Sequence, residues 1–198
     1  TMSDFHATVN SRFFAAAAMA TSKDRHRPYL KGVYIEPSTT NGGVNIVATD
    51  GRVLFFAHDD DATASRAAII APPAHKMARK WMKADTLELD GTLAKAGSEI
   101  AAAPEIDETF PDFRRVMPEQ ASGEASQFDP KYVATVGAIG ELIGCQHPNI
   151  YHNGFDPALV EFGDQPAFGV IMPLRENTHS DCNYEHLLSR VVSVKNER

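Results

Sequence analysis

Four positively charged side chains recur at helical spacing between Ala74 and Lys83, in the string AHKMARKWMK. Their spacing of i, i+3, i+4 and i+7 would place all of them on one face of a helix. Lysine and arginine at this spacing can contact phosphates along a nucleic-acid backbone without reading base edges. An ordinary solvated helix face explains the same pattern, so both interpretations stay open. The four are Lys76, Arg79, Lys80 and Lys83, and Arg12, Lys23 and Arg25 around an earlier predicted helix extend the candidate phosphate-contacting set.

A second cluster, His58 followed by three aspartates, has the residue types of a metal or acid/base site. It lies just beyond a predicted strand in a polar stretch, which favours a solvated turn. No other histidine or carboxylate is spaced to complete a site, and the sequence has no HExxH, GxSxG or P-loop string. We therefore expect no catalytic residues, no metal site and no cofactor.

The composition is that of a folded protein with its own core. The chain has 198 residues, 43% hydrophobic and 23% charged, which suits one or two domains. Cys145 and Cys182 lack zinc-site spacing and form no disulfide framework, which fits a reducing compartment. No run approaches the roughly 18 apolar residues of a membrane span, so we expect a soluble, cytoplasmic protein. The net charge of −7 disfavours wholesale wrapping by nucleic acid but allows one local basic surface.

The elements that must position these residues recur as one helix followed by about three strands. The first helix, about residues 11 to 23, has Asn10 or Ser11 as its cap. Asp50-Gly51 predicts a tight hairpin turn within the stretch 44–58, because this pair tolerates positive φ. Asp129 and Pro130 predict the start of a third helix that runs to about residue 144. The predicted strand regions are 30–37, 44–58, 67–73, 86–91, 98–106, 149–154, 158–163 and 167–175.

Three strings, in this order, resemble motifs of the bacterial β-type sliding clamp, the processivity subunit of the replicative DNA polymerase. They are RPYLKGVYIEP with VNIVATDGRVL, then ETFPDFRRVMP, then FGVIMPLR. They are similar, respectively, to a segment of the clamp's middle domain, to the connector after it, and to the end of the last domain. The resemblance implies an α+β DNA-clamp fold, in which repeated helix-plus-strands units pack their helices on antiparallel sheets.

The resemblance also divides the chain. Residues 1–118 correspond to one complete clamp-like domain, residues 119–176 to a partial clamp-like domain, and residues 177–198 form a C-terminal tail with an amphipathic stretch. The family's ring holds twelve units and this chain shows three, so four chains would close a ring of that size. We therefore expect a homo-oligomer, although the third predicted helix is poor in positive charge.

The family's partner-binding cleft is the site that the resemblance implies. In the family, polymerase subunits, clamp loaders and repair proteins insert a short peptide between the middle and last domains. Apolar side chains at such a junction suit aromatic or aliphatic anchors, although interdomain core explains each residue singly. Arg52 and Val53 replace a His-Arg pair of the family, and an arginine shifted by one residue along a strand would point to the opposite face. The implied lining residues are Leu30, Thr49, Gly51, Arg52, Val53, Leu54, Pro111, Arg115, Val116, Val170, Met172, Pro173, Leu174 and Arg175.

The resemblance implies a non-enzymatic factor of DNA replication or repair. Such a factor would bind double-stranded DNA without sequence preference and would tether a polymerase or clamp-loader-like protein through its peptide. The alternative is a truncated clamp relative that binds such peptides as an interaction module and does not encircle DNA.

Overall fold

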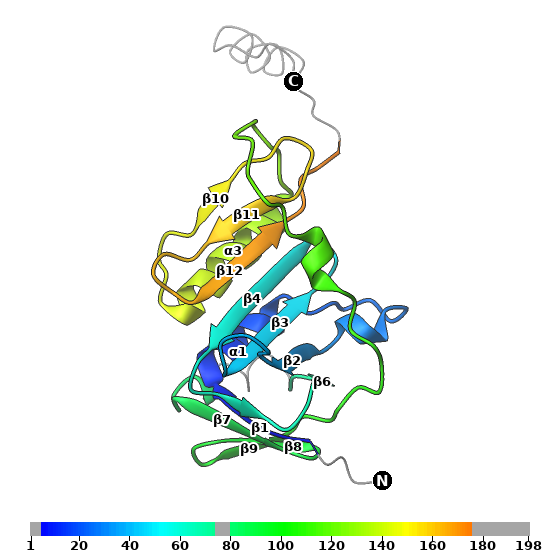
Figure 1. The fold of residues 1–198 in the computed structure, drawn as a ribbon, viewed down its shortest axis with the longest axis vertical. Helices are drawn as coiled ribbons and strands as arrows, with labels where there is room; N and C mark the ends of the chain where they lie inside the picture. The colour runs from blue at the N-terminus through cyan, green and yellow to red at the C-terminus, as the bar shows by residue number, and fades with distance from the viewer. Residues whose placement is uncertain (1–4, 74–79, 176–198) are drawn as a thin grey trace, which may run out of the picture.

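The structure, a computed structural model, describes residues 5–73 and 80–175. The elements form three units along the chain. The first unit has a strand, a helix and three strands in this order, and the later units vary this order (Figure 1). The first unit comprises β1 (His6–Asn10), α1 (Ser11–Met19), β2 (Val33–Pro37), β3 (Val44–Thr49) and β4 (Val53–Asp59), with the short 3-10 turn η1 (Pro28–Leu30) before β2. The second comprises β6 (Ala68–Ile70), a helical segment that ends near Trp81, β7 (Thr86–Asp90), β8 (Leu93–Ala96) and β9 (Glu99–Ala102), preceded by β5 (Thr63–Ala64).

The third unit follows a connector that contains the short 3-10 turn η2 (Phe113–Val116). It has no strand before its helix among the described residues, which distinguishes it from the other two units. Its elements are α3 (Pro130–Ile143), β10 (Asn149–Tyr151), β11 (Ala158–Glu161) and β12 (Ala167–Ile171).

Both described helices begin at the caps that the sequence predicts. The Asn10 side chain accepts hydrogen bonds from the amides of Arg12 at 2.9 Å and Phe13 at 3.3 Å. Asp129 accepts from the amide of Lys131 at 3.0 Å, with Pro130 in the first turn. The prediction for the end of α1 was wrong: the helix stops at Met19, because the chain turns away and the amide of Ser22 bonds to the carbonyl of Leu30.

Two antiparallel sheets make up the strand layers, and one of them crosses the boundary between the units. The five-stranded sheet has the order β5-β1-β7-β8-β9, and the seven-stranded sheet the order β10-β11-β12-β4-β3-β2-β6. β12 of the third unit pairs with β4 of the first, from Ala167 opposite Ala57 to Ile171 opposite Val53. Three short strands, β1, β5 and β8, were not predicted from the sequence.

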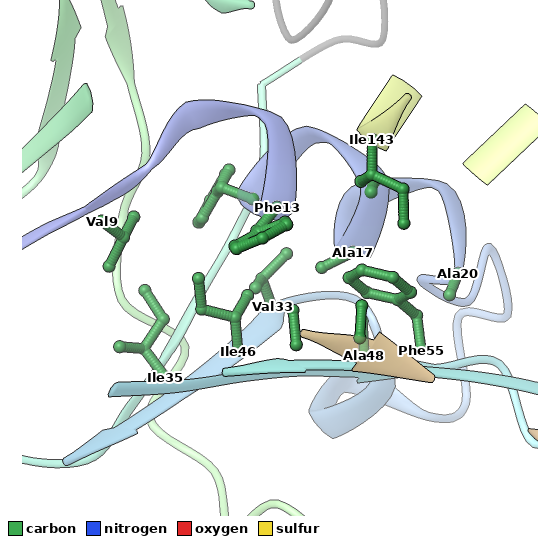
Figure 2. Close-up of a cluster of buried hydrophobic side chains, with 14 of the residues drawn as sticks. Val9, Phe13, Ala17, Ala20, Val33, Ile35, Ile46, Ala48, Phe55 and Ile143 are labelled. Atoms are coloured by element: carbon green, nitrogen blue, oxygen red, sulfur yellow. The ribbon is translucent and has the colours of Figure 1, made fainter. Parts of the chain in front are cut away.

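One continuous core joins the two sheets to the helices. Phe13, Ala17 and Ala20 point from α1 and its C-terminal cap onto the seven-stranded sheet, where Ile46 and Phe55 are fully buried (Figure 2). Figure 2 also shows Ile143 of α3 in the same cluster, since α1 and α3 lie side by side over this sheet. The α+β architecture expected from the sequence, with helices packed on antiparallel sheets, is confirmed. Within the described ranges, no helix is long and apolar enough to cross a membrane.

Candidate functional site

The β3–β4 hairpin turns at Asp50-Gly51, as the sequence predicts. The Asp50 carboxylate accepts hydrogen bonds from the amides of Arg52 and Val53, both at 2.8 Å. Thr49 braces the same turn, since its hydroxyl accepts from the amide of Gly51 at 3.0 Å and donates to the carbonyl of Val53 at 2.7 Å. Gly51 has a φ of 87°, a conformation that other residues adopt only with strain. These bonds hold the end of the hairpin in one conformation.

The last strand of the third unit lies against this hairpin. Val170 of β12 stands opposite Leu54 of β4, and the amide of Met172 donates to the carbonyl of Arg52 at 2.8 Å. Strand pairing therefore continues past the end of β12 and reaches the turn. Residues more than a hundred positions apart in the sequence meet here through backbone bonds.

The connector crosses the opposite face of the sheet from the helices and is fixed there by aromatic contacts. Phe113 of η2 packs against Phe56 with ring centroids 5.9 Å apart, and Phe110 stacks on Tyr34 at 4.7 Å. An ion pair joins Arg114 of η2 to Glu36 of β2. Burial, and then the charge of nearby Glu36, raise the pKa of Tyr34, so this ring stays neutral at physiological pH. The second buried cluster that results comprises Leu30, Val47, Leu54, Ile69, Phe110, Phe113 and Val170.

A cavity of about 260 Å³ lies where the hairpin, β12 and the connector meet. We call it the apolar cleft. Its floor is buried, with Leu30, Leu54 and Val170 each less than 5% exposed, whereas Val116 at its rim is 43% exposed. The residues that line it are Tyr29, Leu30, Thr49, Gly51, Arg52, Val53, Leu54, Pro111, Asp112, Phe113, Val116, Val170 and Met172.

The structure brings ten of the fourteen residues proposed for the peptide-binding cleft to this one cavity. Arg115 does not line it, because its side chain is 84% exposed and pairs with Asp112 at 3.2 Å. Three lining residues, Tyr29, Asp112 and Phe113, were not predicted from the sequence. All three lie within the strings that resemble clamp motifs. The remaining three, Pro173, Leu174 and Arg175, line an adjoining cavity.

The adjoining cavity, of about 770 Å³, has a different chemical character. It shares the lining residues Arg52 and Met172 with the apolar cleft, so the two cavities lie side by side. Arg52 belongs to the turn between β3 and β4 and not to either strand. The alternation of side chains along a strand therefore does not decide which way Arg52 points, and its side chain borders both cavities. The full lining is Arg52, Gln127, Asp129, Lys131, Tyr132, Met172, Pro173, Leu174 and Arg175. We call it the cationic cavity.

The candidate phosphate-contacting residues fall into two groups. Arg12 and Lys83 lie near each other because Ser11, beside Arg12, bonds through its amide to the carbonyl of Asp85 at 3.1 Å. Lys23 and Arg25 follow the other end of α1, a helix of nine residues that spans about 14 Å. All four are exposed, and none has an ion-pair partner among the described residues.

The predicted helix that carries Lys76, Arg79, Lys80 and Lys83 is described only from residue 80 onward. Lys80 is helical and exposed, and its ammonium lies 4.0 Å from Glu99. Lys83 follows the last helical turn, where its amide donates to the carbonyl of Lys80 at 3.2 Å. Lys76 and Arg79 lie outside the described residues, so their placement on a common face stays a prediction.

The side chains of the cluster that begins at His58 make contacts within the fold. The two ring nitrogens of His58 lie 2.8 Å from the Asn45 side-chain oxygen and 2.9 Å from an Asp60 oxygen. Asp59 accepts a hydrogen bond from the amide of Asn10 at 2.6 Å and so ties the end of β4 to the start of α1. Within residues 5–73 and 80–175, no group of three or more histidine, cysteine or acidic side chains is placed to hold a metal ion.

Comparison with known proteins shows that the fold of this chain is similar to that of bacterial sliding clamps. No protein-family model and no curated protein sequence matches the chain. Among solved structures, the C. crescentus beta sliding clamp superposes with a TM-score of 0.66 at 19% identity, over 89% of this chain and 67% of the clamp. The DNA polymerase III subunit beta of Borrelia burgdorferi, solved with a natural product, gives 0.65 at 12%, over 89% and 65%.

The beta subunit from the DNA polymerase of Streptococcus pyogenes gives a TM-score of 0.64 at 15% identity, over 85% of this chain and 65% of that one. The chain therefore has the fold of bacterial β sliding clamps and spans about two thirds of their length. At these identities the similarity establishes a shared fold and no more.

Proposed function

We propose that this chain is a non-enzymatic, clamp-like factor of DNA replication or repair that binds a short linear peptide of a partner protein in the apolar cleft. The partner is a DNA polymerase or a clamp-loader-like protein. Through that peptide, the factor holds its partner at double-stranded DNA, which it contacts without sequence preference.

The observation that carries this proposal is the apolar cleft itself. Three segments that are far apart in the sequence, the hairpin end, the connector and the end of β12, converge on one cavity whose floor is buried and whose rim is open. Apolar pockets of this kind bind the aromatic or aliphatic anchors of an extended peptide, and Met172 can adapt its shape to different anchors. Strand pairing and aromatic packing build the cleft before any partner arrives, which lowers the ordering cost of binding.

The exposed cations around α1 support the contact with DNA. Arg12 and Lys83 at one end, and Lys23 and Arg25 at the other, present positive charge that no carboxylate within the described residues neutralises. Phosphate contacts of this kind are independent of sequence and weaken as salt rises.

One observation favours the alternative, an interaction module that binds peptides and does not encircle DNA. α3 adds little positive charge to the helix side of the sheet: its exposed residues include Lys131 and Glu141, and Lys131 is already paired with Asp129 at 3.1 Å. A continuous basic surface across all three units is therefore not supported, and the measured affinity for DNA decides between the two functions.

The peptide-binding proposal is tested with two matched valines. Val116 is 43% exposed at the rim of the cleft, and Val133 is 41% exposed on α3, outside it. Fluorescence anisotropy of a labelled peptide with a glutamine and spaced leucine and phenylalanine anchors measures binding to the parent, to Val116→Glu and to Val133→Glu. We expect micromolar affinity for the parent, about −8 kcal/mol, because a flexible peptide loses conformational freedom on docking.

The expected result is weaker binding by Val116→Glu alone, since a charge at the rim must lose part of its hydration when an apolar anchor docks beside it. Both valines are exposed, so neither substitution should unfold the protein, and circular dichroism checks this. Equal affinity of all three proteins would place the peptide elsewhere. Absence of binding by the parent would mean that these residues serve only as packing between the units.

A further inference from the structure

The first two units of the chain cover each other's sheets. β6 of the second unit pairs with β2 of the first, from Ile70 opposite Val33 to Ala68 opposite Ile35. In return, β1 of the first unit pairs with β7 of the second over the whole length of both strands. In each unit, the strand that follows the helix is therefore covered by the strand that precedes the helix of the other unit.

The third unit lacks this cover. β10 follows α3 and pairs with β11 on one side, but no strand lies on its other side within the described residues (Figure 1). The chain before α3 reaches only the residues beyond β10, where the amide of Gly123 donates to the carbonyl of His152 at 3.0 Å. β10 itself, Asn149–Tyr151, contains no charged residue and no proline, the usual protection of an open edge. The outer edge of β10 can therefore accept another strand.

The helices differ in the same way, which is seen when α1 and α3 are aligned at their caps, Asn10 and Asp129. Four residues after its cap, α1 carries Phe14, which is fully buried and has its ring 6.1 Å from that of Trp81, at the end of the helical segment of the second unit. The equivalent residue of α3 is Val133, which is 41% exposed. The side of α3 that corresponds to the contact with Trp81 is therefore open. We call this side of α3, together with the edge of β10, the uncovered side of the third unit.

The charges on α3 favour an antiparallel contact with a second α3. Lys131 and Glu141 are exposed near opposite ends of the helix, about 15 Å apart along its axis. Two copies of α3 that pack in opposite directions bring the Lys131 end of each beside the Glu141 end of the other. The ammonium has three donors, so it can reach Glu141 while it stays paired with Asp129 at 3.1 Å. The exposed residues between the two ends are uncharged: Val133, Ala134 and Gly137.

We propose that two copies of this chain pair through the uncovered sides of their third units about a twofold axis, as the first and second units pair within one chain. Each copy brings both the uncovered side and the unit that fits it, so one symmetric contact covers both. The inference is independent of peptide binding and concerns a different surface from the β9 edge, which belongs to the other sheet. One such pair holds two apolar clefts and can therefore hold two partner peptides.

Sedimentation equilibrium at tens of micromolar tests the pairing. Ile100→Glu places a charge on β9, outside the proposed contact, and this protein should keep a mass of about twice 21.6 kDa. Addition of Val133→Glu should weaken the pair at least tenfold, because a glutamate from each copy enters an apolar contact. Val116→Glu, at the rim of the apolar cleft, is the matched control and should leave the pair intact. Peptide binding should respond in the opposite way, with loss in Val116→Glu and none in Val133→Glu.

Cysteine cross-linking identifies the surface that makes the contact. A twofold axis brings the same residue of both copies together, so a single cysteine near the axis can form a disulfide with its own copy. Val133→Cys and Ala134→Cys are compared in protein that carries Cys182→Ser, while Cys145 is buried and stays in place. On mild oxidation, at least one of them should give a covalent dimer. Lys95→Cys, exposed on β8, should not.

Three results would overturn the inference. They are a mass of one chain for the Ile100→Glu protein, a pair that survives Val133→Glu, and no more covalent dimer from the two α3 cysteines than from Lys95→Cys. The first result would mean that another segment, or solvent, covers this side of α3. Absence of peptide binding overturns the proposed function and leaves this inference in place, so the two proposals fail separately.

Discussion

The amide of Met172 donates a hydrogen bond to the carbonyl of Arg52 at 2.8 Å, one residue beyond the last paired position of β12 and β4. This bond fastens the end of the third unit to the hairpin turn of the first. Both residues border the apolar cleft and the cationic cavity. The two cavities therefore depend on how closely β12 lies against β4.

Gly169 keeps that pairing close, and its replacement by alanine should loosen it. A Cβ atom there would lie 3.0 Å from the Leu54 carbonyl oxygen and 3.3 Å from the Val160 Cβ. We expect Gly169→Ala to lower the free energy of unfolding by about 1–3 kcal/mol and to weaken peptide binding, because β12 must move away from β4. Urea unfolding and peptide anisotropy measure the two effects.

The control is another glycine of the same unit. Gly137 lies within α3, and an added Cβ would meet nothing within 4 Å. Gly137→Ala should raise stability by about 1 kcal/mol, through helix propensity, and leave peptide binding unchanged. Unaltered stability and binding in Gly169→Ala would contradict the close packing of β12 on β4.

The cap of α3 predicts a pH dependence of stability. The hydrogen bond from the Lys131 amide, and then the Lys131 ammonium, lower the pKa of Asp129 below 3.8. The charged Asp129 side chain therefore stabilises the fold fully at pH values above the pKa that it has in the unfolded chain. This contribution is lost as the pH falls through the lower pKa that it has in the folded state. Asp129→Asn keeps a capping oxygen but removes the charge.

Urea unfolding at several pH values between about 7 and 3 tests this sign. The parent should be more stable than Asp129→Asn at neutral pH, and the difference should shrink at the acid end. A difference that stays constant or grows on acidification would show that the charge plays no such part.

Salt dependence tests the contact with DNA. Substituting Arg12, Lys80 and Lys83 together by glutamine should weaken binding to duplexes of any sequence. The slope of log K against log salt should fall by about 0.9 for each phosphate that the variant no longer neutralises. Lys95→Gln, on the exposed face of β8, is the control that should leave the slope unchanged. An unchanged slope in the triple variant would mean an ordinary solvated surface, and no DNA binding by the parent would favour the interaction module.

The sheet edges predict self-association. β9 and β10 end their sheets without a further strand in the described part of the chain, and they expose Ile100 at 59% and Tyr151 at 46%. Unpaired edges with apolar side chains tend to associate. Light scattering should give a mass above that of one chain, and a value near four times 21.6 kDa would match a ring of twelve units. Ile100→Glu should lower it, whereas a strictly monomeric parent at tens of micromolar would rule out encirclement of DNA by this chain alone.

Local signals in the sequence accounted for the turns and caps. Asp50-Gly51 and Asp129-Pro130 each fix their conformation through their own side chains and neighbours, so a short string suffices to predict them. β1 escaped prediction because its five residues bury only Ala7 and Val9, too few for an alternating pattern to stand out.

Long-range pairing was beyond local signals. No periodicity indicates that β12 would lie beside β4, and only the motif resemblance linked the two ends of the cleft. The cationic cavity depends further on the start of α3 lying beside Leu174, a contact made through Gln127 that no spacing in the sequence reveals. Phe113 was missed in the same way, since its ring contributes to the cleft only because the connector crosses the sheet.

The most direct test of peptide binding follows the methyl group of Met172 by nuclear magnetic resonance in protein with labelled methionines. Met172 lines the apolar cleft, whereas Met19 packs against the main core at the end of α1. On titration with the anchor peptide, the Met172 signal should shift, and the shift should reach half its maximum when the free peptide concentration equals the dissociation constant that anisotropy gives. The Met19 signal should stay in place. A Met172 signal that does not move when the peptide is fully bound would contradict the assignment of the apolar cleft as the peptide site.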